Sequence, residues 1–327
     1  MSTIKLKSYL LIGTLCVGFL CLFCRCTKKD EVTVTINSWV GFGPLYIAQE
    51  KGFFKDDKGN NLNIKIVKLE AASDRRASLL ADRVQVVAST LDDIAVTLSQ
   101  GVDAAAFCCA DYSNGGDAII AKKEVTLETL HNYKVAAQKG FVNHFFLLYV
   151  LHKNGKTMEP VYEKIRNMEP SDAGAAFLAG NIDVAVTWEP FISQAMQNRS
   201  DCKILASTAD SLYNVAILDI FIAKKDWLKN NPSFAESFRK GWDKALEYLD
   251  KNKDESHRII GKNLGIDAEE VKEMLEGVRY LNSKEGRDLV MPQIKELSKN
   301  VLDIWQAAGY VKESIKYSDL EKCFKLD

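Results

Sequence analysis

Short apolar segments alternate with helical patterns through the first two thirds of this 327-residue chain. Strands that alternate with helices in this way are typical of parallel α/β sheets. The last third differs, because its apolar residues recur at helical spacing, as in Phe234, Phe238, Trp242, Leu246 and Leu249. The pattern therefore predicts an α/β fold whose final third is helical.

A near-duplication relates residues 76–94 to residues 174–192 at a constant offset of 98. In each copy an alanine-rich helical pattern leads into a short apolar strand, which ends in polar or aromatic residues before the next helix. The identical pairs are Ala77 with Ala175, Leu80 with Leu178, Ala81 with Ala179, Val86 with Val184, and Ile94 with Ile192. Chance similarity between short apolar stretches is the alternative explanation.

Two further segments are echoed in the same order. Residues 117–124 are echoed by residues 219–226, and residues 32–44 by residues 134–144. Residues 117–124 and 219–226 each read as a short strand with a charged exit. Residues 32–44 and 134–144 each read as a strand, a loop and a helix. Three echoed blocks in one order indicate an α/β lobe that is built twice.

The echoed strands with charged exits are expected to be the two crossings between these lobes. The chain would then enter the second lobe near Ala118 and return near Asp219. Lobe one would comprise residues 26–117 and 220–327, and lobe two residues 118–219. Two crossings make a hinge for domain closure. Because ligands of such sheets bind beyond the carboxyl ends of the strands, a ligand cleft is predicted between the lobes.

The first loop expected at the cleft follows the strand at residues 32–36. Its glycines let the backbone approach a ligand, and Ser38, Trp39 and Gly41 are the candidate ligand contacts. Trp39 follows directly on the strand and is the leading candidate. Its alternative role is that of a rim or core tryptophan.

The second loop of lobe one offers Ser89, Thr90 and Asp92. Two hydroxyls and the free amides of a helix start can hold a small anion. Asp92 favours a ligand amine instead, unless it only caps the helix, which is the commoner use of such an aspartate.

Lobe two contributes two loops in the corresponding places. In the first, Gly140, Asn143 and His144 stand between a strand and a helix, where the two side chains could donate hydrogen bonds to a carboxylate, sulfonate or phosphate. A lone histidine is more often structural. In the second, Trp188 could stack on a planar or cationic group while Glu189 accepts a hydrogen bond. Glu189 could instead cap the following helix.

Other candidates lie close to the predicted crossings. Asp111 and Tyr112 precede the first crossing, and Tyr213 precedes the second. Arg75 and Arg76 open the helix of the duplicated block, where either could supply positive charge to an anionic ligand. The arginines and helix starts favour an anion, whereas the acids favour an amine or a zwitterion, so the ligand's charge stays open.

The chain begins with a leader. A basic start precedes an apolar run over residues 9–24, which indicates a secretory signal over residues 1–25. Cys26, followed by a charged tether, is the candidate for lipidation, although an arginine stands before it where a lipoprotein signal has a small residue. Cys21 and Cys24 are alternative sites, and an uncleaved anchor is the alternative to cleavage.

Charge and cysteine content exclude some function classes. Loss of the leader removes three positive charges and changes the formal net charge from −1 to −4, which gives no basic face for nucleic acid. The remaining cysteines show no zinc-site spacing and are expected to be buried thiols in a monomer: Cys108, Cys109, Cys202 and Cys323. No metal site or cofactor is expected.

Four segments carry a resemblance to a known family: Trp39 to Phe54 (WVGFGPLYIAQEKGFF), Leu80 to Asp93, Asp111 to Ala121 (DYSNGGDAIIA) and Phe177 to Pro190 (FLAGNIDVAVTWEP). Together they resemble the solute-binding proteins of bacterial ABC importers, in the group for alkanesulfonates, taurine, nitrate or thiamine precursors. The resemblance implies a two-lobed periplasmic-binding-protein fold of type II, with two parallel-sheet lobes joined by two hinge strands. It also implies closure on a ligand and delivery to a membrane permease driven by a separate ATPase, from the periplasm or the outer face of the cytoplasmic membrane.

One loop of the chain differs from the pattern of that group, and an enzyme is the alternative class of function. The loop at Gly140 has Phe141 and Val142 where sulfonate binders have a Ser/Thr-rich form, which argues against an anionic sulfonate. Taken with the other loops, the ligand is expected to be a sulfonate-like or zwitterionic small molecule. The rival is an enzyme that resembles a thiamine-pyrimidine synthase, but Cys108-Cys109 does not match its cysteine-rich motif. No catalytic motif is present, so a non-enzymatic role is expected. A surface sensor without transport is a third possibility.

Overall fold

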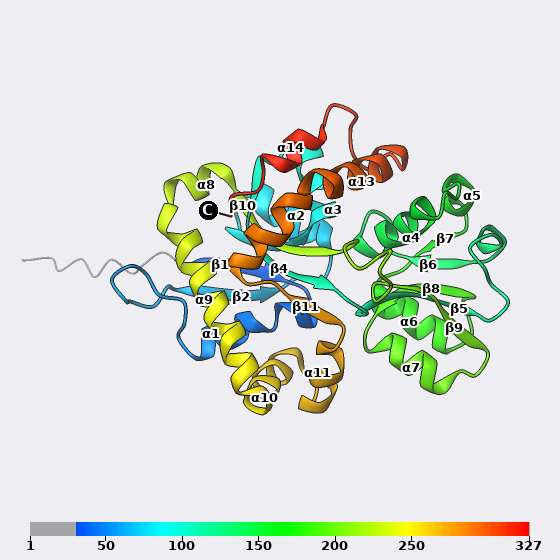
Figure 1. Cartoon of the computed structure of the whole chain (residues 1–327), viewed down its shortest axis with the longest axis horizontal. Coiled ribbons are helices and arrows are strands. Elements are labelled where there is room, and N and C mark those ends of the chain that lie inside the picture. Colours follow the sequence, from blue (N-terminus) through cyan, green and yellow to red (C-terminus); the bar gives the residue numbers. More distant parts are fainter. Residues whose placement is uncertain (1–30, 327) are drawn as a thin grey trace, which may run out of the picture. The chain divides into compact units, whose positions relative to one another are not determined.

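Six strands form one mixed sheet in the computed structural model, which describes residues 31–326 (Figure 1). Their order in the sheet is β11-β4-β10-β3-β1-β2. The strands are β1 (Val32–Ile36), β2 (Ile64–Lys68), β3 (Val86–Thr90), β4 (Ala104–Ser113), β10 (Leu218–Lys224) and β11 (Val278–Tyr280). We call this sheet and its helices lobe one.

Five strands form a second sheet in the order β7-β6-β8-β5-β9. They are β5 (Asp117–Lys122), β6 (Val135–Ala137), β7 (Ile165–Asn167), β8 (Val184–Trp188) and β9 (Cys202–Ser207). We call this sheet and its helices lobe two. The expected α/β fold with two lobes is therefore confirmed.

The sequence echoes correspond to equal places in the two sheets. The order β2-β1-β3-β10-β4 in lobe one matches β7-β6-β8-β5-β9 in lobe two. In each sheet three adjacent strands pair in parallel, as expected, whereas β10 and β5 pair antiparallel with both of their neighbours. Each of these two strands arrives from the other lobe and so enters its sheet at the opposite end. As a result Asp219 pairs with Thr90, and Asp117 with Trp188.

The two crossings are short and bonded to one another. The chain passes from β4 to β5 through residues 114–116 and returns from β9 to β10 through residues 208–217. Thr208 Oγ1 in the return crossing lies 2.9 Å from Ser113 Oγ and accepts a 2.8 Å bond from the Gly115 amide. Gly115 has a φ of +112°, a conformation that favours glycine. The predicted boundaries at 117/118 and 219/220 lie inside β5 and β10, next to these connections.

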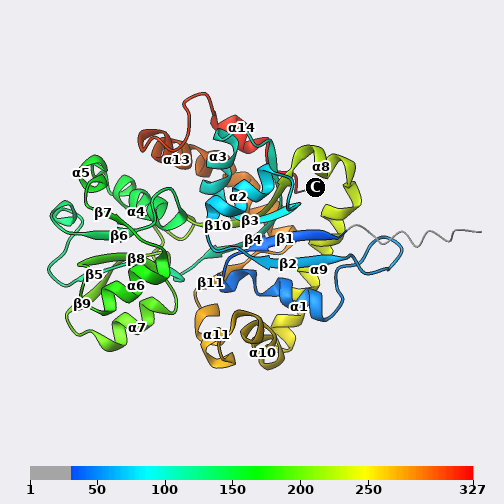
Figure 2. The same cartoon turned by 180° about the vertical axis from the view of Figure 1, so that it is seen from behind.

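Helices cover both faces of each sheet. Lobe one contains α1 (Pro44–Glu50), α2 (Ala72–Leu80), α3 (Leu91–Ser99), α8 (Lys225–Asn230), α9 (Pro232–Lys251), α10 (Lys253–Leu264), α11 (Ala268–Leu275), α12 (Ser283–Glu285), α13 (Ile294–Ala307) and α14 (Tyr317–Glu321). Lobe two contains α4 (Val142–Lys153), α5 (Glu159–Tyr162), α6 (Pro170–Leu178) and α7 (Phe191–Asn198). Figure 2 shows α4 and α5 on one side of the second sheet and α6 and α7 on the other.

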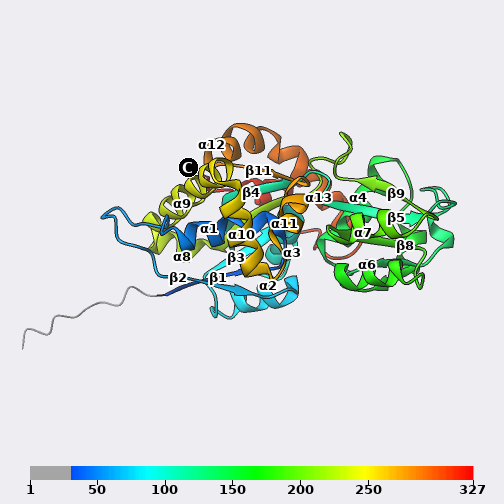
Figure 3. The same cartoon turned by 90° about the horizontal axis from the view of Figure 1, so that it is seen from below.

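The period-two pattern of the strands explains how each sheet is covered. In β5, Ala118 and Ile120 pack with α6 and α7, while Ile119 and Ala121 face the apolar cluster that contains α4. In lobe one, α1, α9, α10 and α11 cover one face (Figure 3). Trp242 of α9 is fully buried there.

A continuous apolar cluster joins the two lobes. It combines α4 of lobe two with α3 and α13 of lobe one. Phe145 and Trp305 have ring centroids 5.6 Å apart, and His144 lies 5.4 Å from Trp305 and 5.5 Å from Tyr310. The start of α4 is thus held against lobe one by aromatic contacts.

Candidate functional site

A small cavity lies where the strand ends of the two lobes meet. Its lobe-one wall includes Trp39, Phe42 and Thr90, and its lobe-two wall includes Phe141 and Trp188. Its volume of ≈ 20 Å³ is room for about one water molecule. The remaining lining residues are Asn37, Arg75, Ala88, Ser89, Asp93, Asp117, Val142, Ile217 and Asp219.

A larger groove of ≈ 380 Å³ shares Phe141 and Trp188 with this cavity. It also takes walls from both lobes: Ser38, Glu70, Leu264, Ile266, Glu270 and Met274 from lobe one, and Glu169, Ser171, Glu189, Pro190, Phe191 and Gln194 from lobe two. We refer to the cavity and the groove together as the cleft.

Trp39, the leading sequence candidate, is 5% exposed and lines the inner cavity. Its amide donates to Asn37 Oδ1, and its indole Nε1 donates to Asp111 Oδ1 at 3.2 Å. Gly41 makes this contact possible, because a Cβ there would overlap both the indole and Asp111 Oδ2. Ser38 lies in the groove and donates from its amide and its hydroxyl to Glu70.

Three buried aspartates meet where the crossings enter the sheets. Asp111 pairs with Asp219 across β4 and β10, and Asp117 begins β5. Asp117 and Asp219 line the cavity. Burial raises the pKa of Asp111 and of Asp117 to about 7, and the Trp39 and Ser113 donors oppose this rise. Burial, reinforced by the neighbouring carboxylates, raises the pKa of Asp219 well above its usual range.

The charged residues of the duplicated helix pair within lobe one. Arg76 forms a buried ion pair with Asp93, whose other oxygen accepts a 2.7 Å bond from Ser89 Oγ. Arg75 donates to the backbone carbonyls of Ala88, Leu69 and Glu70. Arg75 lines the cavity, while its Nε is bonded to β3 and its Nη1 to the loop at residues 69–70.

The other lobe-one candidates differ in whether they line the cavity. Ser89 and Thr90 line the cavity, but Asp92 does not. Asp92 is 3% exposed and accepts a 2.6 Å bond from Thr90 Oγ1. Burial raises the pKa of Asp92 to about 7.

The structure places Gly140, Asn143 and His144 beside the cavity wall rather than in it. Gly140 packs against Tyr310, which a Cβ would overlap. Asn143 donates to the Val186 carbonyl at 3.0 Å, so it ties α4 to β8. His144 is 2% exposed, and its Nδ1 accepts a bond from the Gly140 amide. The apolar contact between the lobes occupies this loop.

The two remaining lobe-two candidates, Trp188 and Glu189, line different parts of the cleft. Trp188 lines both parts of the cleft and packs edge-on against Phe141, with ring centroids 6.2 Å apart. Glu189 lies in the groove and accepts bonds from the amide and hydroxyl of Ser193, the capping contact that was the alternative role.

Two tyrosines near the crossings lie outside the cleft lining. Tyr112 follows Asp111 on β4, and since successive side chains point to opposite faces, it lies in the apolar cluster of the other face. Tyr213 accepts a 2.7 Å bond from Asn154 Nδ2.

Sequence reasoning passed over several cleft residues. Asp117 and Asp219 begin the echoed segments, so their shared position in the repeat was the signal that could have found them. Glu70 and Glu169 carry no such signal, because only the fold brings them to the groove. Cys26 lies outside the described residues. Among residues 31–326, no group of His, Cys, Asp and Glu is arranged to hold a metal ion.

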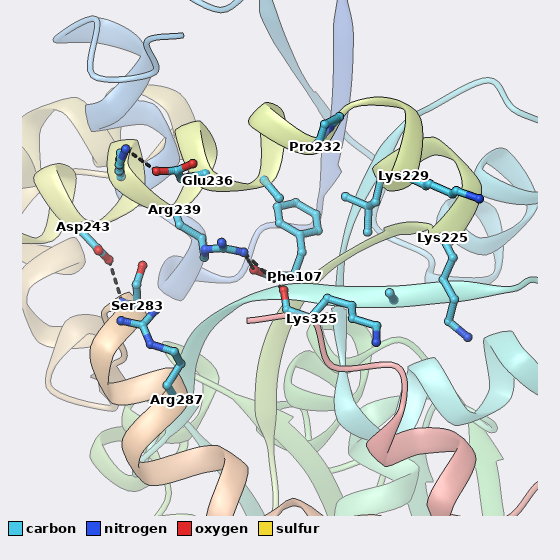
Figure 4. A pocket seen from close by; sticks show the side chains of 14 residues that line it. Phe107, Lys225, Lys229, Pro232, Glu236, Arg239, Asp243, Ser283, Arg287 and Lys325 are labelled. Atoms are coloured by element: carbon cyan, nitrogen blue, oxygen red, sulfur yellow. Dashed lines mark hydrogen bonds and ion pairs between the residues drawn. The ribbon is translucent and has the colours of Figure 1, made fainter. Parts of the chain in front are cut away.

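A larger cavity of ≈ 660 Å³ lies elsewhere, against α9 and β4 (Figure 4). Arg239 crosses it and donates to the carbonyls of Phe107 and Lys325, while Asp243 accepts from the Ser283 amide. All of its walls belong to lobe one. Closure of the lobes therefore could not trap a ligand there, and we place the candidate site in the cleft despite its smaller volume.

Two α/β lobes with equal strand orders, two crossings and a cavity at the facing strand ends define a periplasmic-binding-protein fold. Solved structures agree. The periplasmic aliphatic sulphonate binding protein SsuA from Escherichia coli matches with a TM-score of 0.70 and 16% identity over 90% of this chain and 96% of that one. The periplasmic nitrate-binding protein NrtA from Synechocystis PCC 6803 matches with a TM-score of 0.69 and 16% identity over 92% of this chain and 87% of that one.

Sequence comparison narrows this class to a family. The NMT1-like family model matches residues 26–264, and the chain belongs to that family. The taurine-binding periplasmic protein of Escherichia coli (strain K12) is 23% identical over 298 residues, which cover 88% of this chain and 89% of the relative. The resemblance stated from the sequence is confirmed.

Proposed function

We propose that this protein is the extracytoplasmic solute-binding component of an ABC importer. It traps a small polar organic ligand, sulfonate-like, taurine-like or zwitterionic, between its lobes and delivers it to a permease that a separate ATPase drives. The observation that carries the proposal is the cavity between Trp39 and Trp188, which the matching strand ends of the two lobes enclose. Family membership supports it, because relatives in the comparison are named as periplasmic binding proteins.

Ligand entry requires the lobes to separate. A cavity of ≈ 20 Å³ cannot admit a molecule much larger than water. The crossings at residues 114–116 and 208–217 are the short connections about which such an opening would occur. On this account residues 26–117 and 220–327 move as lobe one, and residues 118–219 as lobe two.

We also propose a binding role without catalysis. Burial raises the pKa of Cys109 to about 12 and that of Cys108 well above its usual range. These thiols therefore stay protonated at neutral pH, whereas a cysteine nucleophile reacts as the thiolate.

The proposed location is the outer face of the cytoplasmic membrane or the periplasm, with a monomer held by a lipid on Cys26. Between residues 31 and 326, no helix has the length and apolar character needed to cross a membrane. Labelled palmitate should enter the full-length protein when it is expressed in bacteria, and Cys26→Ser should block it. Incorporation that survives Cys26→Ser would move the site to Cys21 or Cys24.

A thermal-shift screen tests the binding function. Sulfonates, taurine, nitrate, carboxylates, pyrimidines and amines would be added to the purified protein, and a ligand at 100 times its Kd should add about 2.7 kcal/mol of stability. The shift should disappear in the Trp39→Ala/Trp188→Ala double variant and persist in Trp227→Ala, a tryptophan change outside the cleft. No shift with any compound, or a shift that the double variant retains, would refute the proposal.

A further inference from the structure

Acidic residues strongly outnumber basic residues in the lining of the cleft. The groove carries the glutamates Glu70, Glu169, Glu189 and Glu270, and its lining has no lysine, arginine or histidine. The inner cavity adds Asp93, Asp117 and Asp219 against the single arginine Arg75. A cleft lined by one sign of charge attracts ligands of the opposite sign.

The positive groups near the cavity are already engaged within lobe one. Arg76 pairs with Asp93, so these two charges cancel. Arg75 uses its Nε and Nη1 on backbone carbonyls. Neither Asp117 nor Asp219 forms an ion pair with any residue in the part of the chain that the structure describes. The carbonyl contacts leave the charge of Arg75 in place, and Asp219 attracts it. Asp117 and Asp219 are therefore two carboxyl groups of the inner cavity without an ion pair, opposed by the one positive charge of Arg75.

A third carboxyl group faces Asp219 and, among residues 31–326, also has no counter-charge. Asp111 is fully buried, its Oδ1 accepts from Trp39, and its Oδ2 has no hydrogen-bond partner. It stands opposite Asp219 in the register of β4 and β10. Facing carboxylates without a counter-charge must either share a proton or bind a cation.

The walls around these carboxylates suit an organic cation. Trp39, Phe42, Phe141 and Trp188 all line the inner cavity. Aromatic faces attract ammonium-type groups through the ring quadrupole. They offer nothing comparable to a sulfonate oxygen, which needs hydrogen-bond donors.

We infer that the ligand carries a positively charged nitrogen, which binds between Asp117 and Asp219 against the aromatic walls. The inference rests on the proposed function and narrows its ligand class to amine-bearing molecules, either zwitterions or compact cations. In a zwitterion, the anionic end would face Arg75. The glutamates of the groove then guide the cationic end inward.

Matched ligands and matched variants test the inference by isothermal titration calorimetry. Taurine and ethanesulfonate differ by one ammonium group, and ethanolamine supplies the amine without the sulfonate; a set of other small primary and quaternary amines completes the panel. Amine-bearing compounds should bind and ethanesulfonate should not. Asp117→Asn and Asp219→Asn should each weaken binding about ten- to a hundredfold, the loss of one charge-assisted hydrogen bond. Asp172→Asn makes the same chemical change at an exposed site on α6 and should have no effect.

Different results would refute the inference and the proposed function. If ethanesulfonate or another amine-free anion binds while the amines do not, the inference is overturned and the solute-binding function stands. Amine binding that both Asp→Asn variants retain at full strength also overturns it. If no compound of either charge binds, the proposed function fails together with the inference. Far-UV circular dichroism of each variant verifies that it is folded.

Discussion

Replacement of Asp117 by asparagine should make the ligand-free protein more stable at pH 8 and leave it nearly unchanged at pH 4. Asp117 is 4% exposed and lies near Ser113, which bonds its carboxylate, and near Glu189. Its charge also acts on Asp111 and Asp219. Asparagine keeps the size of the side chain and removes the charge, so the change isolates the electrostatic cost of the carboxylate.

The magnitude follows from the pKa of Asp117, which burial raises from 3.8 to about 7. Because the folded state holds this proton more tightly than the unfolded state, stability is greatest at low pH. It is lost as the pH rises from about 4 to about 7. A shift of about three pKa units at about 1.4 kcal/mol each sets an upper bound of about 4 kcal/mol. The difference between variant and wild type should grow toward that bound across this window and then level off.

Urea denaturation of both proteins at pH 4, 5, 6, 7 and 8 measures this difference. Taking the difference from wild type removes the pH-dependent contributions of every group that the substitution leaves unchanged, including the buried histidines. Asp172→Asn should give a difference that does not change with pH. A variant that is equally stable relative to wild type at all pH values, or less stable at pH 8, would refute the claim that Asp117 is an uncompensated buried charge.

Other substitutions test the packing around the cleft. Trp305→Ala should lower the free energy of unfolding by about 3–5 kcal/mol, measured with urea, because the fully buried indole joins the lobes; a loss below 1 kcal/mol would contradict that role. Gly41→Ala should cost about 1–3 kcal/mol and weaken ligand binding, since its Cβ would displace Trp39 from Asp111; unchanged affinity would speak against that contact. The His144 ring should stay neutral from pH 5 to 8, because burial lowers its pKa to about 4; an NMR titration midpoint near 6.5 would disprove this.

The repeat made much of the fold predictable. Residues that are echoed in the sequence occupy equal places in the two sheets, so that Thr90 pairs with Asp219 where Trp188 pairs with Asp117. Strand ends are local features, and they point to the cleft as soon as the sheets are known. Trp39 and Trp188 could therefore be placed at the cleft from the sequence.

The contacts between lobes were not predictable in this way. His144 and Gly140 follow a strand like the other candidates, but Trp305 and Tyr310, far along the chain, cover them. No feature of the sequence near Gly140 predicts the contact with Trp305 and Tyr310. The charge balance of the cleft was hidden for the same reason, because Glu70 reaches the groove from a loop that the repeat does not include.

A crystal structure of the protein with the tightest ligand from the screen tests the central claim most directly. The account predicts ligand density between Trp39 and Trp188, with a nitrogen within hydrogen-bond distance of Asp117 and Asp219. Density in the larger cavity beside Phe107, or at any site that only one lobe lines, would contradict it.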